Sequence, residues 1–257
     1  ATSGTSSVIF TPSNPFSQDT YTVTVYPSDG FGNKATGQIT FSYDTTAPPV
    51  PTINAVVSPT NQSSQTITGT KSTDTAAIII TSSTATIGAV SYPTSTTWSA
   101  SVSNLKEGLN AITASAKDAA GNQSIAASAV ITYDSKPPAA PTVNALTSPT
   151  KSTTVTLTGT KDANTYLYIG GVKTSVAFAD TSWSYTSNIN EGSNTFTAFA
   201  KDAAGNQSSS AGVSVTRDTT PPKISSSTPL ANAITNQAGS VTVALSDTYS
   251  TVDLQAS

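Results

Sequence analysis

Apolar and polar residues alternate along most of the chain with the period of two that is typical of β-strands. Such runs span 98–102, 109–116 and 129–133, and similar runs follow at 155–158, 194–200 and 212–216. Gly, Asn, Asp and Pro separate the runs at spacings of roughly 8–12 residues, as in β-sandwiches. No stretch has a sustained helical period. The pattern predicts an all-β protein.

An internal repeat shows how these strands are grouped. The octapeptide Lys117–Ser124 returns unchanged at Lys201–Ser208, 84 positions later (201 − 117). A period of this length corresponds to one small domain, because the units of solenoid repeats run roughly 20–45 residues. Three further landmarks recur at similar spacings: Trp98 with Trp183, Gly69-Thr70-Lys71 with Gly159-Thr160-Lys161, and Pro-Pro at 48–49, 137–138 and 221–222.

The landmarks divide the chain into two complete domains and two partial ones. The complete domains are predicted at 47–135 and 136–219. Residues 1–46 carry only the closing part of a domain, and residues 220–257 carry only the opening part. Neither partial domain could bury both faces of a sandwich alone. Joined tail to head, the two would make one complete unit. Pro-Pro after each final strand predicts short, stiff linkers.

Composition narrows the chemistry. The 257 residues include no Cys, His or Met, and charged residues are only 10% of the chain. The first two absences exclude disulfides, thiolate metal sites, a cysteine nucleophile and an imidazole base. The lack of an initiator Met indicates a processed chain or a fragment. A net charge of −3 argues against nucleic acid as a partner, and no segment has the apolarity of a membrane span.

The repeated motifs resemble bacterial immunoglobulin-like (Big-type) tandem domains. The motifs are the Asp-x-x-x-Pro-Pro linker, the Gly-Thr-Lys turn, the Trp-Ser strand, the Glu-Gly-x-Asn turn and the Asp-Ala-Ala-Gly-Asn hairpin. The resemblance implies tandem immunoglobulin-like β-sandwiches in an elongated array, with incomplete half-sandwiches at both ends. It also implies an extracellular location at a bacterial cell surface, as in adhesins, filament proteins and accessory modules of secreted enzymes.

Calcium is the one cofactor with support. In an immunoglobulin-like strand order, the Asp-x-x-Gly-Asn turn, the loop after Gly-Thr-Lys and the preceding linker meet at the pole where the chain enters the domain. Clustered carboxylate and amide oxygens suit Ca²⁺, which takes six to eight oxygen ligands. The predicted ligands are Asp44, Asp74, Asp118 and Asn122 at the first junction, Asp134, Asp162, Asp202 and Asn206 at the second, and Asp218 and Asp247 with Asp29 and Asn33 of another copy at the third. The alternative is an ordinary hairpin, because Asp and Asn before Gly suit tight turns.

Catalytic residues are not expected. Glu107 and Glu191 are the only Glu residues, and they lie in different domains, so they cannot form an acid/base pair. Trp98 and Trp183 are expected in the cores, with a sugar-stacking platform as the alternative. Tyr166 and Tyr168 share one strand face that could be exposed. A crosslink from Lys to Asn is not expected.

The sequence therefore favours a non-enzymatic extracellular protein that builds a bacterial surface fibre or an adhesin stalk. Its expected partners are copies of itself, joined head to tail through the partial domains. Membrane insertion and nucleic acid are not expected. The alternatives are one period of a longer covalent array, closure of head onto tail within one chain, or an accessory module that binds carbohydrate or another surface ligand.

Overall fold

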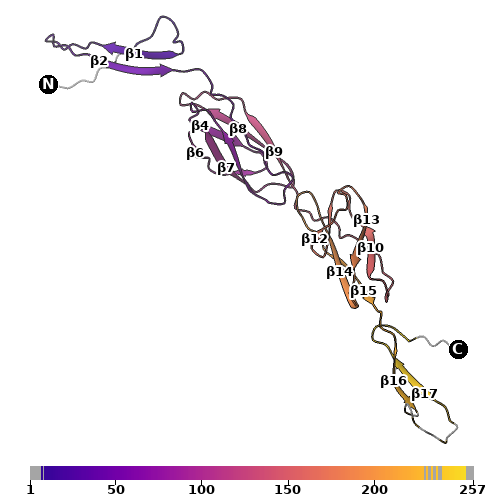
Figure 1. The fold of residues 1–257 in the computed structure, drawn as a ribbon. Coiled ribbons are helices and arrows are strands. Elements are labelled where there is room, and N and C mark those ends of the chain that lie inside the picture. The colour runs from indigo at the N-terminus through magenta and orange to yellow at the C-terminus, as the bar shows by residue number, and fades with distance from the viewer. Residues whose placement is uncertain are drawn as a thin grey trace. The chain divides into compact units, whose positions relative to one another are not determined.

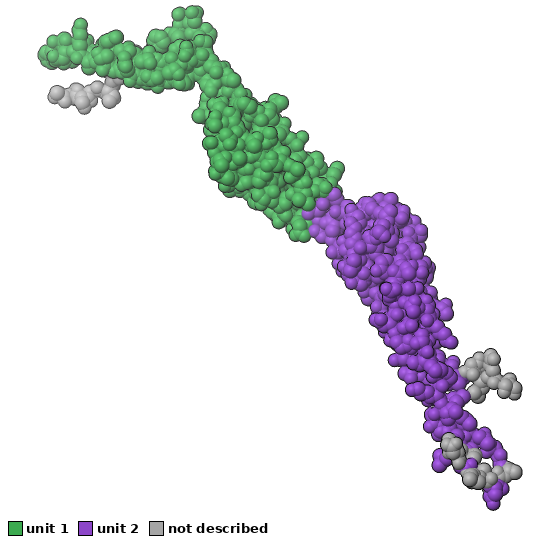
Figure 2. Space-filling view, in the orientation of Figure 1, with its two compact units in different colours: residues 1–58, 62–133 green, residues 59–61, 134–257 purple. Residues whose placement is uncertain are grey.

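The computed structural model describes residue 7, residues 9–228, residues 230, 233 and 236, and residues 239–252. All regular elements in these residues are β-strands, which run from β1 to β17 in chain order. The chain divides into two compact units, residues 1–58 with 62–133 and residues 59–61 with 134–257 (Figure 2). The all-β prediction is confirmed. Within the described residues there is no helix that could cross a membrane.

The first unit contains a two-stranded ribbon and a sandwich of two antiparallel sheets (Figure 1). The ribbon pairs β1 (Asp19–Val25) with β2 (Gly37–Tyr43). One sheet of the sandwich has the order β3-β7-β5 with β6 also on β7, and the other has the order β4-β8-β9. Their bounds are Gln65–Thr70 for β3, Ala77–Thr81 for β4, Thr86–Ile87 for β5, Ser91–Thr94 for β6, Thr97–Ser103 for β7, Gly108–Lys117 for β8 and Ala127–Tyr133 for β9.

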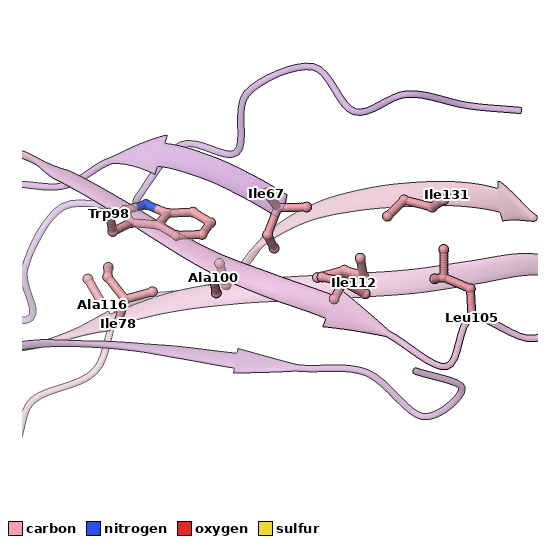
Figure 3. Close-up of a cluster of buried hydrophobic side chains, with 10 residues drawn as sticks. Ile67, Ile78, Trp98, Ala100, Leu105, Ile112, Ala116 and Ile131 are labelled. Atoms are coloured by element: carbon pink, nitrogen blue, oxygen red, sulfur yellow. The ribbon is translucent and has the colours of Figure 1, made fainter. Parts of the chain in front are cut away.

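The core of the first sandwich lies between its two sheets. Trp98 and Ala100 of β7 are buried, and the serines that alternate with them are not. Ile112 of β8 and Ile131 of β9 come from the other sheet and are fully buried (Figure 3). The period of two therefore works as the sequence predicts, because each strand turns every second side chain inward.

The second unit contains the same two parts in the reverse order, a sandwich followed by a ribbon. Its sheets have the orders β10-β13 and β12-β11-β14-β15, and the ribbon pairs β16 with β17. Their bounds are Thr154–Thr160 for β10, Tyr166–Ile169 for β11, Val172–Lys173 for β12, Ser182–Asn188 for β13, Gly192–Lys201 for β14, Ala211–Arg217 for β15, Lys223–Thr228 for β16 and Thr242–Ser246 for β17. Leu157 and Trp183 from the first sheet pack with Leu167 and Ala198 from the second.

The segment that follows each Pro-Pro pair adds a short stretch to a sheet. The amide of Thr52 donates to the carbonyl of Thr70 at 3.0 Å, and that of Asn54 donates to Thr68 at 2.8 Å. In the second unit, Thr142 donates to Thr160 at 2.8 Å in the same way. The chain thus joins the sheet directly after the predicted linker.

Candidate functional site

The repeated Asp-x-x-Gly-Asn turn is closed by its own aspartate. Oδ1 of Asp118 accepts hydrogen bonds from the amides of Gly121 at 2.7 Å and Asn122 at 2.8 Å. Oδ2 accepts a third from Nδ2 of Asn122 at 2.9 Å. Gly121 has a φ of 102°, which an L side chain rarely adopts. The hairpin interpretation therefore describes how β8 turns into β9.

The asparagine of this turn also holds the preceding linker. Nδ2 of Asn122 donates to the main-chain carbonyl of Asp44 at 3.0 Å. In the second unit, Nδ2 of Asn206 donates to the carbonyl of Asp134 at 2.7 Å and to Asp202 at 2.9 Å. We call this arrangement, in which one amide bridges the turn Asp and the linker Asp, the asparagine clasp.

The clasp brings together residues that the sequence placed at one pole. Asp44, Asp118 and Asn122 meet in the first unit, and Asp134, Asp202 and Asn206 meet in the second. The contact with each linker Asp is made by its carbonyl. Its carboxylate instead accepts a local amide, from Thr46 in the case of Asp44 and from Lys136 in the case of Asp134.

Hydrogen bonds within the turn lower the pKa of two of the turn aspartates, Asp118 and Asp29. Desolvation raises the pKa of Asp118, but the hydrogen bonds from Asn122, Gly121 and Ala120 outweigh it and the pKa is lowered. The pKa of Asp29 is lowered chiefly by the side chain of Asn33. Both shifts follow from hydrogen bonds that favour the ionised carboxylate.

Asp74 and Asp162, the other two predicted ligands at these poles, take separate roles. Asp162 accepts the amide of Ala139 at 2.9 Å and so holds the linker a second time. Asp74 is exposed, and its own amide donates to Ser72 Oγ. Within the described residues, no three acidic side chains come close enough to hold a metal ion together. Calcium binding at these poles stays a prediction.

Two of the four residues predicted at the third junction, Asp218 and Asp247, lie near each other in this chain. Asp218 is buried and accepts hydrogen bonds from the amide and hydroxyl of Thr220. A hydrogen bond from Ser250 lowers its pKa, against a smaller opposing effect of burial. Asp247 accepts the amides of Tyr249 and Ser250 and shapes that loop. The structure therefore brings Asp218 and the Asp247 loop together, as the sequence predicts.

The turn at Asp29 is closed by its aspartate in a similar way, with one amide partner that differs, and shows no linker bond among the described residues. Asp29 accepts the amides of Phe31 and Asn33 at 2.9 Å each, and Nδ2 of Asn33 at 2.6 Å. Among the described residues, Nδ2 of Asn33 donates to Asp29 alone.

The lysine of Gly-Thr-Lys has a structural role that the sequence analysis missed. Lys161 is only 5% exposed, and its ammonium donates to the carbonyls of Asp162, Thr165, Phe178 and Asp180. Desolvation lowers its pKa, although nearby Asp180 and Asp162 oppose this. The repetition of Gly-Thr-Lys was the only signal in the sequence that could have pointed to the role.

The glycine of the same motif makes room for the tryptophan. A Cβ on Gly69 would overlap the carbonyl oxygen of Thr52 and the ring of Trp98, and Gly159 is enclosed in the same way. The indole of Trp98 donates to the carbonyl of Thr70 at 3.2 Å. Both tryptophans are buried, so their assignment to the cores is confirmed.

The second sandwich carries an aromatic strip on its outer face. Tyr168 lies opposite Phe199 in the β11–β14 pair, and their rings stack at 4.9 Å. Tyr166 packs against Phe178, and Nζ of Lys173 lies 3.5 Å from the Tyr166 ring centre. These rings are partly exposed, so the predicted shared face of Tyr166 and Tyr168 exists.

Glu191 binds the segment that follows β15. Its carboxylate accepts the amide and hydroxyl of Thr219, at 2.9 and 2.8 Å, and lies 3.6 Å from Arg217. These contacts tie the turn before β14 to the segment that leaves β15.

Comparisons with known proteins give likenesses to solved structures only. No family model matches the chain, and no curated protein matches it. The fibronectin(III)-like modules of Clostridium thermocellum CbhA are 16% identical with a TM-score of 0.41, and the match covers 65% of this chain and 94% of theirs. The Yersinia pseudotuberculosis adhesin InvE is 15% identical with a TM-score of 0.25, and the match covers 65% of this chain and 57% of that chain.

A third likeness is to the Bacteroides ovatus glucan-utilisation protein SGBP-B, a structure in complex with a mixed-linkage heptasaccharide. It is 20% identical with a TM-score of 0.26, and the match covers 78% of this chain and 53% of that protein. For InvE and SGBP-B, the matched part is less than two thirds of their own length. The all-β, immunoglobulin-like sandwich fold of this chain is carried by its own sheets and cores.

Proposed function

We propose that this chain is a structural spacer of an extracellular bacterial fibre or adhesin stalk, without catalytic activity of its own. The observation that carries the proposal is the asparagine clasp, which occurs in both sandwiches and fixes each one to the linker before it. A clasp on the linker restricts how the chain enters the sandwich. Restricted entry suits a protein that sets distance and display.

The path of the chain through the second sandwich supports a load-bearing role. Thr150, in the segment by which the chain enters, pairs in parallel with Arg217 at the end of β15. The amide of Thr150 donates to Thr216, and the amide of Asp218 donates to Thr150, both at 2.9 Å. Because the two segments run in parallel, a pull on the two ends of the sandwich shears them along the strand direction. The hydrogen bonds between them then carry the force together and must break together.

Force spectroscopy on the full chain tests this proposal. We expect two unfolding events, each releasing about 30 nm, because roughly 85 extended residues span that length at about 3.5 Å each. Unfolding without a resolved force peak, or turnover of a substrate by the purified protein, would contradict a structural role.

Calcium enters this proposal as an optional stiffener of the junctions. Titration calorimetry at millimolar Ca²⁺, the range of weak extracellular sites, tests it directly. Heat that saturates, with a rise in melting temperature, would support binding. No heat and an unchanged melting temperature would remove calcium from the account and leave the asparagine clasp as the junction.

The second candidate function is an accessory module that binds carbohydrate. The aromatic strip of Tyr166, Tyr168 and Phe199 on an outer sheet face favours it, since partly exposed rings can stack on sugar rings. A glycan array separates the two candidates. Binding that is lost in Tyr168→Ala and kept in Thr186→Ala, on the other sheet, would favour the module. An array without hits would count against it.

A further inference from the structure

The β1–β2 ribbon has one polar and one apolar face. On the polar face, the hydroxyls of Thr22 and Thr40 hydrogen bond across the strands at 3.2 Å. On the other face, the register places Tyr21 opposite Phe41 and Val23 opposite Ile39. Phe16 packs over Tyr21 and Phe41, but Ile39 is 66% exposed. The ribbon thus leaves part of an apolar sheet face in water.

The first sandwich shows what covers this face when it is buried. Val23 lies six residues before the turn aspartate Asp29, as Ile112 lies six before Asp118. Phe41 lies three residues before the linker aspartate Asp44, and Ile131 lies three before Asp134. Ile112 and Ile131 are both fully buried. Their cover is the sheet that contains β3 and β7.

The β16–β17 ribbon has the matching exposed face. Val241, Val243 and Leu245 alternate along one side, with Val241 70% and Val243 45% exposed. The run Val241-Thr242-Val243 corresponds to Val155-Thr156-Leu157, where β10 begins.

In the second sandwich the apolar residues of the corresponding run pack into the core, Leu157 fully and Val155 partly. Leu157 is 1% exposed, and its core includes Ala198 of β14 with Val213 of β15 packed beside it. The β14–β15 hairpin is the counterpart of β1–β2, because both flank the same Asp-x-x-Gly-Asn turn. The chain therefore shows a β10-type strand packed across a hairpin of the β1–β2 type.

The two ribbons also carry a matching polar donor and acceptor, the side-chain amide of Asn33 and the main-chain carbonyl of Asp218. Asn122 and Asn206 each donate to the carbonyl of a linker aspartate, whereas Asn33 donates only to Asp29 among the described residues. Asp218 is the linker aspartate that precedes the β16–β17 ribbon, and within the described part of the chain no hydrogen bond to its main-chain carbonyl occurs.

We propose that the β1–β2 ribbon of one copy binds the β16–β17 ribbon of a second copy, with their apolar faces in one shared core and Asn33 donating to the carbonyl of Asp218. This inference rests on the proposed structural function and names the contacts that would join its units. Each copy keeps one free ribbon of each kind, so the contact is heterologous and continues from copy to copy.

Two complementary lysine variants test the pairing in the full chain. Ile39→Lys places a charge on the apolar face of the β1–β2 ribbon, and Val243→Lys does the same on the β16–β17 ribbon. Controls on the polar faces are Thr40→Lys and Thr242→Lys. Light scattering after size-exclusion chromatography measures mass at protein concentrations on the order of 10 µM, where a micromolar interface is populated.

The wild type and both controls should form a concentration-dependent series of oligomers. Each apolar-face variant alone should stay monomeric, because it offers only one working ribbon. An equimolar mixture of Ile39→Lys and Val243→Lys should give dimers and nothing larger, since one working ribbon of each kind remains. Asn33→Ala should weaken association about five- to tenfold, the effect of one hydrogen bond.

Two results would overturn the pairing: a wild type that is monomeric over the whole concentration range, or oligomers that persist in both apolar-face variants. Retained β-sheet circular dichroism shows that a variant is folded. The proposed structural function has its own readout, because the force peaks of the two sandwiches come from a single chain. Monomeric protein with both peaks would reject the pairing alone.

Discussion

The two sandwiches share their clasp and differ in how they treat the lysine of Gly-Thr-Lys. Lys161 is buried and donates to four carbonyls of the loops around it. Lys71 is partly exposed and donates to two, those of Ser72 and Thr75. Their outer faces differ as well, with Tyr168 opposite Phe199 in the second sandwich and Ile79 opposite Ser115 in the first.

The comparison teaches which parts of the repeat are tied to the junctions. The clasp, the glycine under the tryptophan and the linker stretch beside β3 or β10 occur in both sandwiches. The outer sheet faces and the loop around the lysine vary. The contacts that set the course of the main chain at the junctions are thus the same in both sandwiches, whereas the outer sheet faces and the loop around the lysine differ.

The largest expected effect is the loss of a core tryptophan. Trp98→Ala should destabilise the first sandwich by about 3–5 kcal/mol, the usual cost of emptying a large aromatic site. The chain has two tryptophans, one in each core, so the remaining Trp183 reports on the second sandwich alone. Urea unfolding followed by circular dichroism and by fluorescence measures both.

Trp183→Ala is the matched experiment for the other sandwich. In each variant the circular dichroism transition of the mutated sandwich should move, and the fluorescence transition of the intact one should not. A shift of equal size in the fluorescence transition would show that the two sandwiches unfold together.

The next largest effect, the loss of stability on replacing the lysine of Gly-Thr-Lys, should differ between the two sandwiches. Lys161→Met should cost about 2–3 kcal/mol and Lys71→Met about 1 kcal/mol, because buried carbonyls that lose a charged donor are left unsatisfied. Chemical unfolding in single-tryptophan backgrounds, Trp98→Phe for Lys161 and Trp183→Phe for Lys71, measures each loss. Lys117→Met, at an exposed position, is the control. Equal losses at the two lysines would mean that the extra carbonyl acceptors around Lys161 contribute little to the stability of the second sandwich.

Local signals in the sequence predicted the strands well. Alternation placed β7, β8 and β14 correctly because a pleated strand turns every second residue inward whatever its neighbours are. The repeat also predicted that Asp44 and Asn122 would meet. It could not show that the carbonyl, rather than the carboxylate, makes the contact, since this depends on the direction of the main chain.

Burial and exposure depend on what packs across a sheet and are harder to predict. Lys161 and Lys71 stand in the same motif, yet only Lys161 is buried, because the loop carrying Phe178 and Asp180 supplies extra carbonyls. Ile39 belongs to a strand as amphipathic as β9, but no second sheet lies across it in the described residues. No local pattern distinguishes the two lysines, and for Ile39 only the spacing of the repeated landmarks predicts a partial domain at residues 1–46.

A smaller effect tests whether the clasp stabilises both sandwiches equally. Asn122→Ala and Asn206→Ala should each cost about 1–2 kcal/mol, since each removes hydrogen bonds to the turn and to the linker. Limited proteolysis should also cut the linkers after Asp44 and Asp134 faster. Asn33→Ala, which removes no linker bond, should cost less in the monomeric chain. Losses of the same size at all three positions would assign the stabilisation to the turn alone.

The smallest expected effect is a dependence on pH that arises from the clasp aspartate. Hydrogen bonds hold the pKa of Asp118 below its ordinary value in the folded chain. The ionised form is therefore favoured by folding, and its contribution is complete above the unfolded pKa of about 3.9. It is lost as the pH falls through the lower folded pKa.

The urea midpoint of the first sandwich, read by Trp98 in a Trp183→Phe background, should thus fall on acidification from about pH 5. Asp118→Asn should lower the midpoint at neutral pH and flatten its fall in acid, because the amide keeps the shape of the carboxylate without its charge. Asp74→Asn, an exposed substitution near the same pole, should leave the slope unchanged. A slope in Asp118→Asn as steep as that of the wild type would place the acid sensitivity on other carboxylates, and the clasp would then act through its neutral bond from Asn122 to Asp44.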